Sequence, residues 1–257
     1  MNTYKYLLEK SNKDINYVRS YVFKNYIKTV IENSNDELNR VMFIANRFKS
    51  DFNNPMSFEC NGLIAEYNKK SNNWKMLVVP TELFNSQKLI KSEINNYYNH
   101  NNYQLHKVYD GTIINLYYYK DSWRISTNKA YDANNLLYTD NKTYLDVFNE
   151  ILNNYPNFTV DKLSTNKCYT LCMKYYKYHP FIENPHENQN KLIFIQSVDM
   201  DELNLNKKLK INNQEDLGIE IAEIYDLNNF ASLQNIYLIL NNEINRFKKE
   251  NQYENYK

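Results

Sequence analysis

The chain has 257 residues, of which 31 are Lys or Arg and 30 are Asp or Glu, so it is long enough for one large domain or two small ones with a sizeable core. The near-zero net charge argues against a protein that coats nucleic acid indiscriminately, but it allows a local basic groove. Only three glycines are present, at Gly62, Gly111 and Gly218. They exclude the dinucleotide-binding glycine fingerprint and the P-loop, because both motifs need several glycines within a few residues.

The three cysteines, Cys60, Cys168 and Cys172, are odd in number, and no second pair lies near them to complete a zinc site. We expect buried thiols and a reducing compartment. Residues 1–5 lack an apolar signal core, and no run approaches the roughly 18 apolar residues that span a bilayer. The sequence therefore predicts a soluble, cytoplasmic protein without a membrane partner. Its wealth of Asn, Tyr, Lys and Ile, whose codons are rich in A and T, indicates an A+T-rich genome.

Apolar residues follow a helical spacing through the first part of the chain, which predicts two or three helices in an N-terminal helical cap over 1–52. Residues 53–257 are predicted to form the core, and the whole chain is expected to be a single compact unit. The first core segments, 58–67 and 74–79, are typical of two strands joined by a polar turn, as in a β-hairpin.

The later elements alternate between strand and helix patterns, and the strands dominate the middle of the chain. They indicate an α+β fold of mostly antiparallel sheets with helices at the N-terminus, in the middle and at the C-terminus. In chain order we expect a helix over 86–98, strands over 104–109, 112–119 and 123–126, a helix over 142–152 capped by Asp140 or Asn141, strands over 168–176 and 191–197, a short helix from Asp199, a strand over 219–225, and a helix over 233–249.

The most informative segment runs from Lys107 through Asp110 and Gly111 to Thr112, where a strand ends in a charged residue and an apolar strand follows. Asp-Gly supplies the positive-φ geometry of a type I′ turn, so one interpretation is a plain β-hairpin. The arrangement also resembles the nucleotidyltransferase core shared by RNA ligases, DNA ligases and capping enzymes, whose lysine nucleophile lies just before an Asp-Gly turn. That resemblance makes Lys107 the candidate nucleophile.

Further pieces in the same order resemble the phage-type RNA ligase family. Upstream, 58–64 followed by 74–85 resembles the family's Arg-Gly stretch, two strands and an ending of the form Pro-x-x-x-Phe-Phe-Asn. Downstream, 125–129 resembles its basic strand-end motif, while 169–174 and 192–195 take the place of its late core strands. The similarity covers about residues 50 to 200, and it implies a ligase-like, ATP-grasp-like nucleotidyltransferase core.

In that family a lysine amine attacks the α-phosphate of ATP and forms a phosphoramidate, while a carboxylate on a neighbouring strand usually binds the divalent metal. The resemblance implies nucleotide and RNA ends as binding partners, and ATP or another nucleotide with Mg²⁺ as the cofactors of an active enzyme. The residues it implies for nucleotide and phosphate binding are Lys75, Asp110, Gly111, Lys129 and Lys174.

The sequence departs from the family's pattern at four points. Val108 stands where the family has its lysine, and Lys107 precedes it, so Lys107 points to the opposite face of a strand unless a bulge intervenes. Asn61 replaces the arginine of the Arg-Gly pair. Lys174 replaces the metal-binding glutamate, which reverses the charge. Nothing after Ile219 resembles the family's last Glu-Gly turn and its lysine pair.

Each candidate also has a plainer interpretation. Lys107 can be a solvated lysine at a strand end, and exposed lysines such as Lys75 and Lys129 are common there. The aromatic run over 175–181 can stack bases or pack in the core. His179 and His186 lack partner ligands at metal spacing, so no metal site is predicted.

Three hypotheses follow. The first is a degenerate RNA-ligase-like protein, a pseudoenzyme that keeps the cleft and binds nucleotide or RNA ends without competent adenylation. The second is an active ATP-dependent RNA ligase in which a bulge realigns Lys107. The third is a structural or interaction protein that keeps only the fold, for instance in a viral assembly, with a protein partner.

Overall fold

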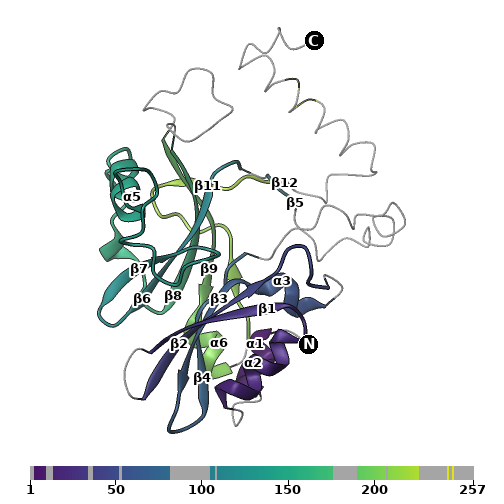
Figure 1. Cartoon of the computed structure of the whole chain (residues 1–257). Helices are drawn as coiled ribbons and strands as arrows, with labels where there is room; N and C mark the ends of the chain where they lie inside the picture. The colour runs from purple at the N-terminus through teal and green to yellow at the C-terminus, as the bar shows by residue number, and fades with distance from the viewer. Residues whose placement is uncertain are drawn as a thin grey trace. The chain divides into compact units, whose positions relative to one another are not determined.

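The computed structural model describes residues 3–9, 14–33, 37–51, 54–81, 105–107, 109–175, 190–206, 208–225, 242 and 245. The chain divides into two compact units. The first consists of Met1–Asn85 with Tyr109–Ala222, and the second of Ser86–Val108 with Glu223–Lys257. The described residues form an α+β structure with two larger, mostly antiparallel sheets and five α-helices (Figure 1).

The first sheet has four antiparallel strands in the order β1-β2-β3-β4. Short helices of the amino-terminal part pack against it, and Tyr6 of the first helix stacks on Tyr21 of the second at a ring distance of 4.4 Å. The elements are α1 (Thr3–Glu9), α2 (Ile15–Phe23), β1 (Ile27–Asn33), β2 (Leu38–Ala45), α3 (Pro55–Glu59), β3 (Asn61–Asn68) and β4 (Asn73–Val78).

The predicted helical pattern over the first 52 residues is only partly right. Helices α1 and α2 are present, whereas β1 and β2 occupy 27–33 and 38–45. Strand β1 is rich in β-branched residues, which favour strands. Strand β2 is apolar at most positions because both of its faces are covered, and such a run cannot be told from a helix by periodicity. The domain boundary at residue 52 stays a prediction.

The hairpin predicted over 58–67 and 74–79 is confirmed, because β3 and β4 pair antiparallel. Its first strand begins later than predicted, since Phe58 and Glu59 belong to α3. Asn72 adopts φ +54° in the connecting turn, a left-handed conformation that Asn tolerates well.

The second sheet follows the order β10-β9-β8-β6-β7, with β11 parallel to β9. The predicted middle strands over 112–119, 123–126, 168–176 and 191–197 are therefore confirmed, with small shifts at their ends. The elements are β6 (Thr112–Tyr119), β7 (Ser122–Ser126), α5 (Tyr144–Leu152), a 3₁₀ turn (Val160–Lys162), β8 (Lys167–Lys174), β9 (Lys191–Asp199), α6 (Met200–Asn206), β10 (Ile211–Asn212) and β11 (Glu220–Ile221).

The Asp-Gly hairpin was a wrong prediction. Strand β6 is paired on one edge with β7 and on the other with β8, so no edge is left for the preceding segment. That segment, β5 (Leu105–His106), pairs instead with β12 (Ile224–Tyr225) inside the second unit. Positive φ values occur at Lys120 and Asp121, the two-residue turn between β6 and β7, as a type I′ turn requires.

Helix caps differ in how well the sequence predicts them. The short helix predicted from Asp199 is confirmed as α6, and the Asp199 side chain accepts hydrogen bonds from two backbone N–H groups at its start, at 3.0 and 2.9 Å. Helix α5 is capped by Thr143, not by Asp140 or Asn141. Thr143 and Asp146 form a reciprocal capping box, which satisfies two backbone donors instead of one. The helices predicted over 86–98 and 233–249 lie outside the described residues, apart from positions 242 and 245.

Two apolar clusters cover the sheets of the first unit. One surrounds the first sheet and includes Tyr117, Tyr119 and Cys168 from the second. The other fills the space between the second sheet and α5. All three cysteines are free and buried, as predicted. None of the described helices combines the length and apolar character needed to cross a bilayer.

Candidate functional site

A row of buried polar side chains crosses one face of the second sheet. Strand register places Asn115 opposite Ser126 on β7 and opposite Thr170 on β8, so the three side chains share a face. The Thr170 hydroxyl donates to Asn115 Oδ1 at 2.8 Å, and Asn115 Nδ2 donates to Ser126 Oγ at 3.5 Å. Hydrogen bonding of this kind offsets the cost of burying polar groups, and it fixes the sheet at this level.

Further along the same face, Gly111 lies against β8. A Cβ at Gly111 would stand 2.5 Å from Cys172 Sγ and 3.2 Å from Lys174 Cγ, so only glycine fits without a shift. Burial is the main cause that raises the pKa of the Cys172 thiol to about 11. The charge of Lys174 acts to lower this pKa, whereas the charge of Asp110 acts to raise it. The structure therefore brings together three of the predicted site residues: Asp110, Gly111 and Lys174.

A second contact joins the two sheets at the beginning of β3. Gly62 adopts φ +95°, and a Cβ there would stand 2.8 Å from Asn128 Cα and 2.9 Å from Thr127 O. The Thr127 hydroxyl accepts hydrogen bonds from the backbone N–H groups of Lys129 and Ala130, at 3.2 and 3.1 Å. This turn presents Lys129 on the surface directly after β7, next to the Asn61–Gly62 step.

Lys129 and Gly111 lie toward the same end of the second sheet. Strand β6 begins just after Gly111, and β7 ends at Ser126, opposite Asn115. Thr112 and Asn115 are three positions apart, which corresponds to about 10 Å along the strand. The sheet end therefore carries Asp110, Gly111, Lys174 and the Lys129 turn.

Lys75 has a different setting. It is exposed on β4, where its partner across the strand pair is Glu66. Glu66 follows Gly62 by four residues, so Lys75 is paired about 13 Å along β3 from the contact at Gly62. Opposite charges at paired positions stabilise a sheet surface, so the register alone accounts for this lysine.

Lys107, the predicted nucleophile, belongs to the second unit. Its backbone N–H donates to Glu223 O at 2.9 Å, and its Nζ forms an ion pair with Glu223 Oε2 at 3.1 Å. Both side chains are partly exposed. Val108, where a realigning bulge was considered, lies outside the described residues.

The aromatic run over 175–181 is described only at Tyr175. That residue is buried, and its hydroxyl lies within hydrogen-bonding distance of Glu150 and Lys142. At this position the packing interpretation holds.

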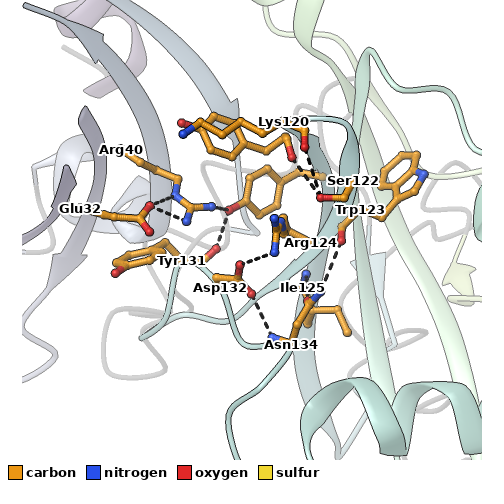
Figure 2. Close-up of polar contacts among 12 residues, drawn as sticks. Glu32, Arg40, Lys120, Ser122, Trp123, Arg124, Ile125, Tyr131, Asp132 and Asn134 are labelled. Carbon is orange, nitrogen blue, oxygen red and sulfur yellow. Dashed lines mark hydrogen bonds and ion pairs between the residues drawn. The ribbon is translucent and has the colours of Figure 1, made fainter. Parts of the chain in front are cut away.

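Arg40 was not predicted from the sequence, although it is the most connected cation between the two sheets (Figure 2). Its side chain is only 5% exposed and forms an ion pair with Glu32 at 2.5 Å. Its Nη1 donates to the Tyr117 hydroxyl at 2.6 Å, and that hydroxyl donates to Tyr131 O at 2.5 Å. The guanidinium also lies over the rings of Tyr119 and Tyr131, 4.8 and 4.6 Å from their centroids.

The charge of Arg40 is retained despite its burial. Burial acts to lower the pKa of the guanidinium, but Tyr117 and Glu32 act in the other direction, and the pKa ends above its usual value. Burial raises the pKa of Tyr117, so the Tyr117 hydroxyl stays protonated and can donate a hydrogen bond. A sequence signal existed, since Arg40 is the only charged residue between Leu38 and Ala45.

The loop after β7 is held by a second ion pair. Arg124 Nη1 contacts Asp132 Oδ2 at 3.1 Å, and Asn134 Oδ1 accepts from the backbone N–H of Ile125 at 2.7 Å (Figure 2). These contacts fix the loop that carries both Lys129 and Tyr131.

No known family profile matches the chain. The chain is distantly similar to viral proteins named as RNA ligases. It is 26% identical over 145 residues to a protein called "Putative RNA-ligase" from a Kenyan pig isolate of African swine fever virus. Proteins of the same name from a Malawian tick isolate and a South African tick isolate are 27% and 25% identical over the same length.

Each of these matches covers 49% of this chain and 31% of the viral relative. The chain therefore spans about a third of the length of the relatives it matches. The similarity supports an RNA-ligase-like protein with relatives among viral proteins.

Ligation of that kind implies ATP and Mg²⁺, and Mg²⁺ is usually bound by one or two carboxylates together with the phosphates of the nucleotide and water. Among the described residues, no group of three or more His, Cys, Asp or Glu side chains lies close enough together to hold a metal ion. At the sheet end, Lys174 places an ammonium where the family pattern has a carboxylate. Such a cation repels Mg²⁺ and attracts a phosphate.

Proposed function

We propose that this chain is a degenerate RNA-ligase-like protein with a nucleotidyltransferase fold, which binds a nucleotide or an RNA end without forming a lysyl-adenylate. The observation that carries the proposal is the packing of Lys174 against Gly111: a Cβ at Gly111 would stand 3.2 Å from Lys174 Cγ, and the Lys174 charge acts to lower the pKa of the adjacent Cys172 thiol. The distant similarity to viral proteins named as RNA ligases supports the same class.

The charge pattern around Lys174 supports anion binding. Lys174 lies directly opposite Lys191 in the β8–β9 register, and like charges in that position are destabilising. Lys191 is neutralised by Glu220 at 2.9 Å, whereas no described carboxylate forms an ion pair with Lys174. An anionic ligand at this sheet end would offset the remaining charge. A phosphate is the anion that the family resemblance implies, and the proposal includes Lys129, which lies toward the same sheet end, as a second contact.

The environment of Lys107 supports the absence of adenylation. A lysine nucleophile must be neutral when it attacks. In the structure the Lys107 amine is engaged by Glu223 at 3.1 Å, and attack on a phosphate would have to break this ion pair. Lys174, at the position where the family pattern has a metal-binding glutamate, adds to this.

Binding titrations test the proposal. We expect saturable binding of AMP, ATP or a 5′-phosphorylated RNA oligonucleotide in the presence of EDTA, because the site holds its anion without a metal. Lys174→Ala should weaken binding by about tenfold, the usual effect of losing one charged hydrogen bond. Lys208→Ala, an exposed lysine near the end of α6, is the matched control and should bind like the parent protein.

A purely structural protein would bind none of these ligands, and a nonspecific one would lose as much affinity in Lys208→Ala as in Lys174→Ala. Either result would overturn the proposal.

A further inference from the structure

Exposed aromatic side chains of the described residues are concentrated in one region. The chain has 25 Tyr and 12 Phe, and most of the described ones are buried or half-buried. Every described aromatic residue that is exposed comes from α2, from the turn just before β1 or from the turn just after β2. These side chains are Tyr17, Tyr21, Phe23, Tyr26 and Phe48.

Two of these aromatic residues, Phe23 and Tyr26, line a groove that opens beside α2. Residues 16, 19, 20 and 23 of α2 line it, and they share one helix face because they are spaced three or four positions apart. The groove has a volume of about 680 Å³. Its complete lining is Asn16, Arg19, Ser20, Phe23, Tyr26, Ile27, Lys28, Thr29, Asn46 and Lys49. We call it the α2 groove.

A braced turn carries Phe48 between Asn46 and Lys49, two residues that line the α2 groove. Asn46 Oδ1 accepts hydrogen bonds from the backbone N–H groups of Phe48 and Lys49, at 2.9 and 3.1 Å. The Ser50 hydroxyl in turn accepts from Asn46 N at 3.1 Å. Phe48 is nevertheless 98% exposed. The turn therefore presents a large apolar ring to solvent in a fixed position, where no packing within the described part of the chain accounts for it.

Tyr26 is presented in a similar way. It adopts φ +57°, a left-handed conformation that is unfavourable for a bulky residue. Its carbonyl accepts from Asn46 N at 3.1 Å and from the Ser50 hydroxyl at 3.3 Å, so the conformation is tied to the neighbouring turn. Its ring is still more than half exposed.

The charge of the α2 groove is positive. Arg19, Lys28 and Lys49 line it, and no acidic residue does. Lys24 and Arg47 are exposed beside it in the sequence. None of these five cations forms an ion pair with a carboxylate of the described ranges, and Arg19 Nε donates instead to Thr29 Oγ1 at 3.3 Å. The groove therefore combines uncompensated cations with exposed rings.

The α2 groove runs along β1, the edge strand of the first sheet, and takes side chains from both of its faces. Thr29, which contacts Arg19 of α2, points to the other side from Glu32, which contacts Arg40, because the side chains of a strand alternate between faces. Lys28 also lines the groove, and it lies on the same side of β1 as Glu32.

We propose that the α2 groove binds the backbone and bases of single-stranded nucleic acid, at a site separate from the nucleotide site. Lysine and arginine side chains would contact successive phosphates, while Phe23, Tyr26 and Phe48 would stack on unpaired bases. Cations beside exposed rings are the chemistry that single strands require, because every base has a face that an aromatic ring can stack on. A duplex hides those faces, so it should bind more weakly.

Fluorescence anisotropy with a circular single-stranded RNA of about 16 nucleotides tests this, because a circle has no end for the proposed RNA-end site and such sites span roughly 4 to 16 nucleotides. We expect Phe23→Ala and Phe48→Ala each to weaken binding by about fivefold or more, the usual effect of losing a stacked ring.

Lys28→Gln should reduce the slope of log affinity against log salt by about 0.7, the value for one phosphate contact on a single strand. Leu205→Ala and Lys210→Gln, both exposed on or after α6, are matched controls and should bind like the parent protein.

The proposal would be overturned if Phe23→Ala and Phe48→Ala bound the circular RNA as tightly as the parent protein does, or if a duplex of the same length bound with equal affinity.

The same variants should be compared by sedimentation and with phosphatidylserine vesicles. A dimer that dissociates in Phe48→Ala would assign the rings to a second copy of the chain, and vesicle binding in place of RNA binding would assign them to a lipid surface. Loss of ATP binding in Lys174→Ala has no effect on these outcomes, so the two proposals fail independently.

Discussion

Arg40 of β2 donates a hydrogen bond of 2.6 Å to the hydroxyl of Tyr117 on β6, and this contact joins the two sheets of the first unit. Glu32 on β1 forms an ion pair with the same guanidinium, and the rings of Tyr119 and Tyr131 lie over it. The buried guanidinium of Arg40 thus has an ion pair and a hydrogen bond, and removing it leaves Glu32 and the Tyr117 hydroxyl without this partner.

We expect Arg40→Ala to lower the free energy of unfolding by about 3 kcal/mol or more, since it leaves Glu32 and the Tyr117 hydroxyl with an unmet interaction. Arg124→Ala is the matched control because its pair with Asp132 is partly exposed and should cost only about 1 kcal/mol. Urea denaturation followed by circular dichroism measures both. Equal losses in the two variants would contradict the role assigned to Arg40.

The contact between Gly62 and the 127–128 backbone gives a second prediction. Gly62→Ala forces a left-handed alanine and a collision with Asn128 Cα, and we expect a loss of about 3 kcal/mol or more. Gly218 is also left-handed, at φ +77°, but a Cβ there would stand 3.3 Å from the Asn157 side chain. Gly218→Ala should therefore cost only the conformational part, about 1 to 2 kcal/mol. The idea fails if thermal denaturation gives both variants the same loss of stability.

Gly111 and Cys172 should be coupled energetically. Gly111→Ala places a methyl group 2.5 Å from Cys172 Sγ, so the single variant should be destabilised by about 2 kcal/mol. Cys172→Ala removes the sulfur, and the double variant should recover about 1 kcal/mol relative to the sum of the singles. A double-mutant cycle in urea measures this coupling. Strict additivity would show that the two residues are not in contact.

The buried thiols predict a stability that decreases in alkali. Burial raises the pKa of Cys60 to about 12, whereas a thiol in an unfolded chain titrates near about 8.5. Between these values the unfolded state loses a proton that the folded state keeps, so the free energy of unfolding falls as pH rises. The contribution is fully present below about pH 8 and decreases from about pH 9 to 11.

Cys60→Ala tests this linkage. The variant should reduce the slope of unfolding free energy against pH by about 1.4 kcal/mol per pH unit in the alkaline range, which is the effect of one proton. Any cavity left by the substitution shifts the whole curve and leaves the slope unaffected. A slope identical to that of the parent protein would refute the linkage.

Local signals predicted much of the second sheet. The run from Thr112 to Tyr119 has the apolar and β-branched composition of a strand, and β6 has those bounds. The short helix predicted from Asp199 is α6, and Asp199 accepts a hydrogen bond from the backbone at its start. By contrast, β2 was mistaken for a helix because both of its faces are buried, and a continuous apolar run has no period that distinguishes the two.

Long-range contacts were beyond the reach of sequence reasoning. Gly62 meets Asn128 across 66 positions of the chain, and Arg40 meets Tyr117 across 77, so no local pattern reports either contact. The pairing of β5 with β12 is another case, since a strong Asp-Gly turn signal was overridden by the occupied edges of β6. Among the candidate residues, those that lie close together do so because of the β6–β8 register.

Intact-protein mass spectrometry after incubation with saturating ATP and Mg²⁺ tests the central claim most directly. We expect the mass of the protein to stay unchanged while parallel titration shows that ATP is bound. An added AMP, stable to denaturation, lost in Lys107→Ala and kept in Lys208→Ala, would contradict the account and identify an active ligase-type nucleotidyltransferase.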